Sequence, residues 1–265
     1  MGSATALDTL ASCGAIETVI HVLRVTRSWR EGPTRDEFED QLVPTVYYLC
    51  RIDKMRLARA ARHGVATLLA ACVARRRHLK QFALAVLCEL CHCAATDNSC
   101  GDALWDAGGI SLYANLLVEA YWGVRALAAL AAWLKADVRV QAAIAQPHCA
   151  TSVVLLFRKL DRAEFEQALP PLLDACETSP QFARALLDVG MNAFAYELGR
   201  KLQKHTSAII RKALLEILRA ILAAAWDPVE LLRAANLDVV LTSLRGNSDQ
   251  VLVTELAKSL FSSPS

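Results

Sequence analysis

The sequence predicts an all-α protein built from stacked helical repeats, and three observations lead to this. Ala, Leu and Val carry most of the apolar content of 54%, while aromatic residues make up only 6%, a balance that favours helices over strands. Glycine and proline contribute only 11 and 8 of the 265 residues, which excludes a collagen-like or disordered chain. A short pattern also recurs along the whole chain, as it does in repeat proteins.

The recurring pattern is an amphipathic stretch, then a residue that tolerates a left-handed turn, then an apolar helix. It recurs at Gly14, Gly64, Gly108, Gly190 and Asn236, and residues 146–150 fill the remaining gap. The spacings are about 39 to 50 residues, in and just around the ~40–47 residues of armadillo and HEAT repeats. Glycine at the turn and a long third helix favour armadillo units over two-helix HEAT units.

We therefore expect one domain with an armadillo/HEAT-like fold, a right-handed superhelical solenoid of about six three-helix repeats. The expected units are 1–52, 53–96, 97–136, 137–178, 179–226 and 227–265. In the second unit, for example, the three helices are expected over 54–63, 65–73 and 79–94.

Prolines and polar stretches predict where helices begin, bend or stop. Four prolines fall between helices or at helix starts, where a missing N–H costs little: Pro33, Pro147, Pro180 and Pro228. Pro170 and Pro171 fall inside the third helix of the fourth unit, and a kink is expected there. The polar stretch 26–40 is expected to be a mobile connection between the second and third helices of the first unit.

Charge and hydropathy restrict the partners. Lys and Arg total 29 against 27 Asp and Glu, a net charge of +2, so nucleic acid or an anionic membrane is not expected as the main partner. The longest clean apolar run, 126–134, is about half of the ~20 residues that span a bilayer. With no secretory signal at the N-terminus, we expect a cytoplasmic protein without a membrane span.

The nine cysteines are expected to be mostly buried free thiols of a reducing compartment. Cys88, Cys91, His92 and Cys93, with Cys100, have some likeness to a zinc cluster. They continue an apolar helical stripe, however, and Cys93 points about 100° away from His92, so one helix cannot bring four ligands together. We expect no metal ion and no cofactor.

Several stretches closely resemble the C-terminal armadillo region of one kinase family, the plant epsilon-type mitogen-activated kinase kinase kinases and the fungal septation-initiation kinases. These stretches are 79–92, 107–117, 122–127, 186–191 and 250–260. The resemblance spans about Leu7 to Leu260 and is densest over 79–127. It implies a non-catalytic targeting region of a Ser/Thr kinase in cytokinesis or cell-cycle signalling. Family members act downstream of a small GTPase that recruits the kinase to spindle poles or a related site.

No catalytic half of such a kinase is found in these residues. A Gly-rich phosphate loop, a strand lysine, and H-R-D and D-F-G elements would be needed. We expect no catalytic residues and a chain that is not itself an enzyme. Two alternatives remain open: a free-standing armadillo adaptor, or the targeting end of an ATP-binding Ser/Thr kinase whose catalytic domain precedes Met1.

The only dense basic run is Arg75, Arg76 and Arg77, followed by His78 and Lys80, between the second and third helices of the second unit. One interpretation is a solvated loop. The other is a site for an acidic partner surface or a phosphate, since clustered guanidinium groups bind both. The family resemblance does not support the second interpretation.

The partner surface is expected over the second and third units, at Glu89, Asn115, Tyr121 and Trp122. Trp122 has two interpretations, an exposed interface anchor or a packing residue between repeats. Peptide-binding armadillo proteins repeat an Asn along their third helices. Here those positions hold Tyr48, Glu89, Ala132, Asp174 and Arg219. The missing Asn ladder argues against a nuclear-import or catenin-like peptide reader and favours a folded partner or a basic segment.

Overall fold

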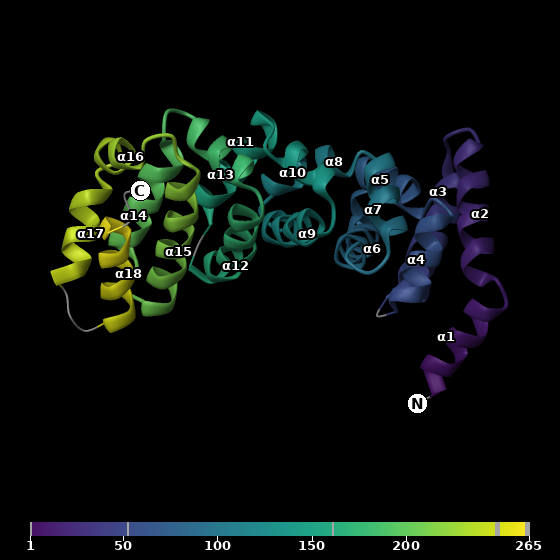
Figure 1. Ribbon diagram of the computed structural model, residues 1–265. Coiled ribbons are helices and arrows are strands. Elements are labelled where there is room, and N and C mark those ends of the chain that lie inside the picture. The colour runs from purple at the N-terminus through teal and green to yellow at the C-terminus, as the bar shows by residue number, and fades with distance from the viewer. Residues whose placement is uncertain (1, 52, 161, 247–249, 263–265) are drawn as a thin grey trace. The chain divides into compact units, whose positions relative to one another are not determined.

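The computed structural model describes residues 2–51, 53–160, 162–246 and 250–262. These residues form eighteen α-helices and one 3₁₀ helix, and they contain no strand (Figure 1). The all-α prediction is therefore confirmed. The helices divide into two compact units, unit 1 over residues 1–112 and unit 2 over residues 113–265, and the boundary falls inside α8 (Gly109–Leu117). The expectation of one domain remains a prediction.

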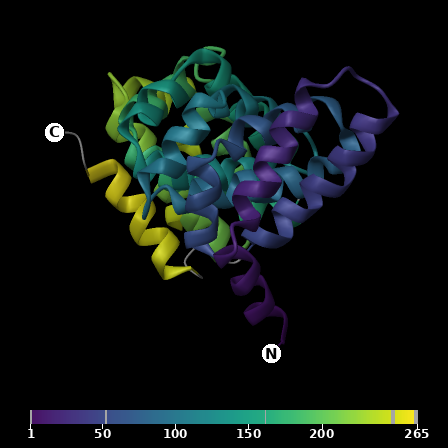
Figure 2. The same ribbon diagram turned by 90° about the vertical axis from the view of Figure 1, so that its right-hand side faces the viewer.

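In unit 1, helices that follow one another in the sequence pack against each other. They are α1 (Gly2–Ser12), α2 (Ala15–Ser28), α3 (Pro33–Cys50), α4 (Lys54–Arg62), α5 (Val65–Arg75), the 3₁₀ helix η1 (Arg77–Leu79), α6 (Lys80–Cys93) and α7 (Asn98–Asp106). α2 and α3 lie side by side and are joined by a short loop (Figure 2). The long helices α3 and α6 contact each other, and α5 and α7 both pack on α6.

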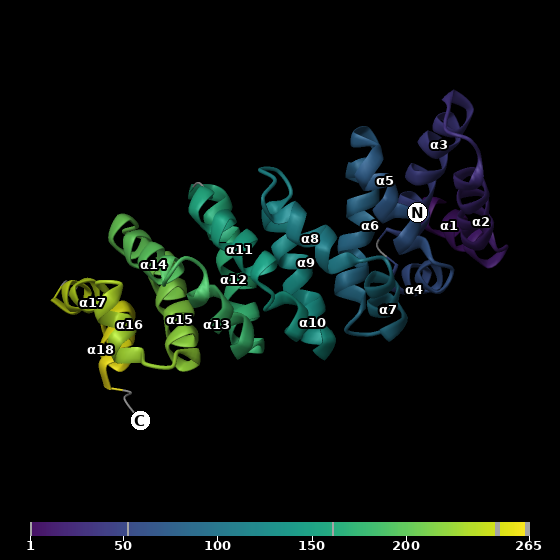
Figure 3. The same ribbon diagram turned by 90° about the horizontal axis from the view of Figure 1, so that it is seen from above.

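Unit 2 continues the pattern of two shorter helices followed by a third one. Its complete helices are α9 (Gly123–Ala136), α10 (Val138–Ile144), α11 (Pro147–Lys159), α12 (Arg162–Thr178), α13 (Pro180–Asp188), α14 (Ala193–Lys204), α15 (Ala208–Ala224), α16 (Pro228–Ala234), α17 (Leu237–Gly246) and α18 (Val251–Ser262). The third helices α9, α12, α15 and α18 each contact the next one and form a single layer (Figure 3).

A side-chain cap starts the first helix in five successive helix triplets. The capping residues are Asp53 before α4, Asp97 before α7, Asp137 before α10, Ser179 before α13 and Asp227 before α16. Each of them accepts a hydrogen bond from a backbone N–H in the first turn of its helix, at 2.8 to 3.2 Å. Such caps stabilise a helix start by roughly 0.5–2 kcal/mol.

The expected left-handed turns between the first and second helices are confirmed. Positive φ angles occur at Gly14, Gly64, Gly108, Gly190 and Asn236. At Gly64, with φ of 78°, the chain leaves α4 and enters α5 in a conformation that costs other residues about 1 kcal/mol or more. Before α11 the chain has no such turn. Gln146 has φ of −64°, and Pro147 opens the helix instead.

The expectation of a long polar connection over residues 26–40 is wrong for most of that stretch. α3 already begins at Pro33, so only residues 29–32 lie between α2 and α3. Arg35 and Glu39 stand one helical turn apart, both are buried, and Arg35 Nε donates to Glu39 Oε1 at 3.3 Å. Arg35 and Glu39 can therefore be buried in a packed helix, because their opposite charges neutralise each other.

The internal prolines do not divide their helices. α12 runs through Pro170 and Pro171, and α3 runs through Pro44. Each proline removes one N–H from the helix, so a carbonyl four residues earlier loses its donor. The kink expected at residues 170–171 remains a prediction.

Within the described residues, no single helix is long and apolar enough to cross a bilayer, whereas three bent pairs of neighbouring helices reach the required length and apolarity together.

Candidate functional site

The layer of third helices in unit 2 carries exposed charges that pair between neighbouring helices. Lys135 Nζ of α9 lies 2.7 Å from Asp174 Oδ2 of α12. Arg219 of α15 lies 4.0 Å from Glu177 of α12. Exposed pairs of this kind contribute only ~0–1 kcal/mol each. A partner can therefore replace them at little cost, and the layer offers it charges of both signs.

In unit 2, the charged residues that stand where peptide-binding armadillo proteins have Asn form ion pairs with neighbouring helices. Asp174 and Arg219 each sit in an ion pair with a neighbouring third helix, and Ala132 lies on α9. No side-chain amide occupies these positions to hydrogen-bond an extended peptide backbone. The surface is suited to charge recognition instead.

The third helices of unit 1 carry aromatic rings instead of a charge ladder. Tyr47 of α3 lies edge to face with Phe82 of α6, with ring centroids 5.6 Å apart, and with Tyr48 at 5.1 Å. Tyr48 is exposed, and the guanidinium of Arg51 lies 5.4 Å from the centre of the Tyr47 ring. Exposed aromatic side chains next to an arginine are common at the centre of protein interfaces.

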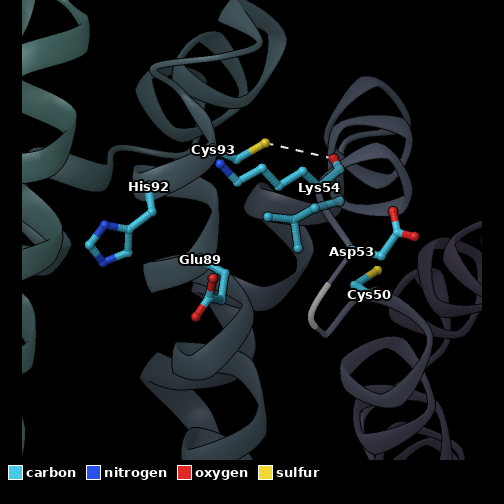
Figure 4. Close-up of a pocket in the computed structure, with 7 residues that line it drawn as sticks. Cys50, Asp53, Lys54, Glu89, His92 and Cys93 are labelled. Atoms are coloured by element: carbon cyan, nitrogen blue, oxygen red, sulfur yellow. Dashed lines mark hydrogen bonds between the residues drawn. The ribbon is translucent and has the colours of Figure 1, made fainter.

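Glu89 lines a small pocket of about 100 Å³ in unit 1 (Figure 4). Glu89 and His92 come from α6, and Asp53 and Lys54 come from the start of α4, with Cys93 Sγ 3.7 Å from the Lys54 carbonyl oxygen. Burial raises the pKa of Cys50, at the end of α3, to about 12. That thiol therefore stays protonated and is a poor nucleophile.

The cysteines near this pocket are mostly core residues. Cys91, Cys93 and Cys100 are buried, and Cys88 is half-buried. Among the described residues, no group of three or more His, Cys, Asp or Glu side chains is placed to hold a metal ion.

Carboxylates of α3 occupy two of the three arginines in the basic run. Arg75 donates to both oxygens of Glu39 at 2.8 Å and to Glu31 at 3.0 Å. Arg76 pairs with Asp40 at 2.6 Å and also with Asp36. These guanidinium groups tie α5 and η1 to α3, which neither interpretation of the sequence anticipated.

Among the residues that the structure describes, Arg77 and His78, at the end of the basic run, make fewer ion pairs than Arg75 and Arg76. His78 Nε2 lies 2.7 Å from Asp40 Oδ1. Arg77 is exposed and has no ion pair within the described residues. A phosphate or an acidic partner would therefore meet one available arginine here, not three.

The remaining predicted site residues lie in unit 2. Trp122 is only 8% exposed, whereas Tyr121 is 68% exposed and Asn115 is also exposed. The guanidinium of Arg125 lies 5.2 Å from the Tyr121 ring centre and 5.4 Å from that of Trp122. Of its two interpretations, packing fits Trp122. Glu89 and the three arginines belong to unit 1, so a common surface for all of these residues remains a prediction.

One exposed aromatic residue was not singled out from the sequence. Trp226 follows α15 and is exposed, and the Arg184 guanidinium of α13 lies 4.2 Å from its ring centre. The two residues line a pocket of about 160 Å³ together with Asp188 and Glu230. A tryptophan directly before the Asp-Pro start of a helix is the signal that could have drawn attention to it.

Known proteins match nearly the whole chain. Cytokinesis protein sepH of Aspergillus terreus is 30% identical over 265 residues, which are 98% of this chain and 19% of that protein. MAP3K epsilon protein kinase 2 of Arabidopsis thaliana is 29% identical and covers 96% of this chain, with 18% of its own length matched. The chain is homologous to one region of this cell-division kinase family. Cell division control protein 7 of Schizosaccharomyces pombe is also related, with 26% identity over 228 residues.

This homologous region accounts for only about a fifth of the length of the curated relatives it matches. The family resemblance predicted from residues 79–127 and their neighbours is confirmed. No family model matches the chain.

Solved structures show the same fold in proteins of distant sequence. A computationally designed armadillo repeat protein for modular peptide recognition has a TM-score of 0.71 at 15% identity, over 93% of this chain and 98% of the other. A designed armadillo repeat protein in complex with the peptide (KR)4 has a TM-score of 0.68 at 14% identity, over 93% and 99% of the two chains. The chain therefore has the fold of an armadillo-type α solenoid, as the repeat spacing predicted.

Proposed function

We propose that this chain is a non-catalytic protein-binding region of a cell-division signalling Ser/Thr kinase, and that it recruits the kinase through a small GTPase or a spindle-pole or septation scaffold. Homology to cytokinesis protein sepH over 98% of the chain supports the cellular process. The observation that carries the proposal is the layer of α9, α12 and α15, whose exposed charges form ion pairs from helix to helix. Extended helical surfaces of this kind serve solenoids for binding proteins.

The charges favour a folded partner over an extended basic peptide. One structural neighbour holds the peptide (KR)4. In this chain Asp174 and Glu177 of α12 are each paired with a cation, Lys135 and Arg219 respectively. A basic peptide would have to displace both cations and would leave them unpaired, while a folded surface with charges of both signs could match the whole pattern.

The proposed place of action is the cytoplasm, at the cytoskeleton or spindle poles of dividing cells. The runner-up function is a free-standing armadillo adaptor, which would use the same surface without a kinase. Both functions require a protein partner and neither requires a catalytic residue in this chain.

The test is direct binding between the purified chain and small GTPases of cytokinesis, each loaded with GDP or with a non-hydrolysable GTP analogue, measured by calorimetry. The informative variant exchanges Lys135→Asp with Asp174→Lys. This exchange keeps the ion pair but reverses the charge that each helix offers to a partner. We expect binding to one nucleotide state and at least a tenfold loss of affinity in the exchanged variant.

The matched control exchanges Glu255→Lys with Lys258→Glu within α18, an exposed pair 2.8 Å apart that lies outside the proposed surface of α9, α12 and α15. Its affinity should stay within about twofold of the unmodified chain, because exposed pairs contribute little. Absence of binding to any GTPase or septation scaffold, or equal affinity of both exchanged variants, would contradict the proposal. Fluorescent fusions of the same variants in dividing cells test the location.

A further inference from the structure

A cavity of about 360 Å³ opens in unit 2, where the end of α11 and the start of α12 meet the connection between α14 and α15. Much of its lining is polar or basic, and includes Lys201, Lys204, His205, Thr206 and Ser207, with Glu166 as the acidic exception. The volume exceeds that of a few water molecules, each of which takes about 30 Å³ in the liquid. The cavity has room for a small polar group and the side chain that carries it.

Lys201 of α14 is a buried cation that makes no ion pair with any carboxylate of the described residues. Its side chain is only 3% exposed, Nζ donates to the Leu160 carbonyl oxygen at 3.3 Å, and Nζ lies 4.4 Å from the centre of the Phe165 ring. Within the described residues no carboxylate lies within ion-pair distance of Nζ. An ammonium has three N–H groups, and within the described residues the Leu160 carbonyl oxygen accepts one of them.

Burial lowers the pKa of Lys201, as expected for a desolvated ammonium. Desolvation lowers its pKa, and the charge of Glu197 acts in the opposite sense but does not compensate. Glu197 is itself engaged with Arg200, to which it is bound at 2.9 Å. Buried charges are normally paired, and within the described residues Lys201 Nζ meets a carbonyl oxygen and two aromatic rings, so an anion in the cavity would be favourable beside it.

The start of α15 adds backbone donors to the same cavity. α15 is 17 residues long, and Ser207 at its N-cap makes no side-chain hydrogen bond to the first turn. The first N–H groups of an α-helix have no acceptor within the helix, and the helix dipole gives this end a positive partial charge. Ser207 and Ile210 of this first turn line the cavity.

The connection that carries these groups is held in place. Arg211 Nε donates to the His205 carbonyl oxygen at 2.7 Å, and Gln250 Nε2 donates to the Thr206 carbonyl oxygen at 2.8 Å. The His205 ring stacks on Phe165, with centroids 4.9 Å apart and an interplanar angle of 8°. The donors are thus positioned before any ligand arrives, which reduces the entropy cost of binding.

We infer that this cavity binds a phosphate monoester, carried on a serine or threonine side chain of a protein partner. The buried ammonium of Lys201, the exposed ammonium of Lys204 and the first turn of α15 would surround the phosphate oxygens. Ammonium groups and helix N-termini are common donors to phosphate. The inference rests on the proposed function for the source of the phosphate, but not for the anion site itself.

Glu166 allows a test of whether the charge of the cavity determines phosphate binding. Its carboxylate lines the cavity and has no ion-pair partner among the described residues. It repels a phosphate and so limits affinity. Glu166→Gln should therefore strengthen phosphate binding by about three- to fivefold, corresponding to an exposed charge pair, whereas a purely structural role of the cavity predicts no change.

The experiment titrates the full chain with inorganic phosphate, then with the capped peptide Gly-Gly-phosphoSer-Gly-Gly and its unphosphorylated form, followed by amide chemical shifts and calorimetry. We expect saturable shifts at residues 206–210, and tighter binding of the phosphopeptide than of either other probe. Lys204→Gln should weaken phosphate binding by about three- to fivefold. Lys201→Met, which keeps the stem, should weaken it by about tenfold or more.

The matched control is Lys54→Gln, which removes an exposed lysine of unit 1 and should leave affinity unchanged. Since Lys201→Met could unfold unit 2, Lys204→Gln and Glu166→Gln carry the test at the surface of the cavity. Absence of saturable shifts, equal effects of Lys204→Gln and Lys54→Gln, or no preference for the phosphopeptide would each overturn the inference.

Failure of this inference and failure of the proposed function are distinguishable. If the GTPase or scaffold binds as proposed but Lys204→Gln does not weaken any phosphate probe, only the inference falls. If phosphate and phosphopeptide bind while no GTPase or scaffold does, the phosphate site stands and the proposed recruitment falls.

Discussion

Glu39 offers the sharpest test of how unit 1 is held together. Its side chain is fully buried, accepts two hydrogen bonds from Arg75 at 2.8 Å and one from Arg35 at 3.3 Å. Glu39→Gln keeps the shape but removes the charge, leaving Arg35, whose side chain is 7% exposed, with only the exposed carboxylate of Glu31 at 3.9 Å among the described residues. Loss of one partner from a buried pair costs about 3–5 kcal/mol.

The expected cost lies at the low end of that range. The Arg75 side chain is 30% exposed and keeps Glu31, so it recovers part of its hydration. We therefore expect Glu39→Gln to lower the free energy of unfolding by about 3 kcal/mol. For a chain of this size the melting temperature would fall by roughly 6–12 °C. Urea unfolding and thermal melting, both monitored by circular dichroism, measure the two quantities.

A second variant decides whether the cost comes from the uncompensated charge. Arg35→Met with Glu39→Leu replaces both buried charges by apolar side chains of similar volume, a change that is often neutral. This double variant should be at least 1.5 kcal/mol more stable than Glu39→Gln. The reasoning is refuted if Glu39→Gln costs less than about 1 kcal/mol, or if the double variant is the less stable of the two.

Four further predictions concern the caps, the packing and the thiols. Hydrogen bonds from Ser99 hold the pKa of Asp97 below its usual range, so Asp97→Ala should cost about 0.5–2 kcal/mol at neutral pH and progressively less below about pH 4 in urea unfolding. Gly123→Ala should cost about 1–3 kcal/mol in the same assay, because the new Cβ would lie 2.8 Å from a backbone oxygen of α8. Trp122→Ala should cost about 3–5 kcal/mol by thermal melting, as for a core residue. Cys13, the exposed thiol, should react with Ellman's reagent first, and the buried thiols only after unfolding.

Specific outcomes would contradict these four. A cap penalty that stays constant from pH 7 to pH 3 would mean that the Asp97 charge contributes nothing, since its stabilisation is present above the unfolded pKa of ~3.9 and lost as the carboxyl protonates in the folded state. A neutral Gly123→Ala, unchanged melting of Trp122→Ala, or rapid reaction of several thiols in the native chain would each show that the burial described above is incorrect.

Local signals made the fold predictable. Glycine at a turn, such as Gly64, and the apolar stripes of the third helices each determine the conformation of a few neighbouring residues. These local signals recur at the repeat spacing along the chain, so the same interpretation applies to each repeat. The helix within the polar stretch 26–40 is not predictable from composition, because composition does not reveal that Arg35 and Glu39 pair on one side of a helix. The recurring caps do have a sequence signal, since Asp or Ser stands at each of these helix starts.

The environments of the candidate site residues depend on contacts with residues that are distant in sequence, and a single sequence does not reveal such contacts. The partners of Arg75 and Arg76 lie 36 to 44 residues away, so a run of positive charge became an internal network. The low exposure of Trp122 agrees with its packing interpretation, and its role in partner binding stays a prediction. Lys201 gave no signal at all, because Phe157 and Phe165 around its ammonium come from α11 and α12.

The five side-chain caps at Asp53, Asp97, Asp137, Ser179 and Asp227 have a consequence for how such a chain changes over generations. Each cap belongs to the helix triplet that it opens, so a duplicated or deleted triplet brings or removes its own start signal. Gain or loss of one triplet therefore leaves the first helix of each remaining triplet with its own capping side chain. The gene can therefore lengthen or shorten in whole repeats, and the layer of third helices offered to a partner grows or shrinks by one helix at a time.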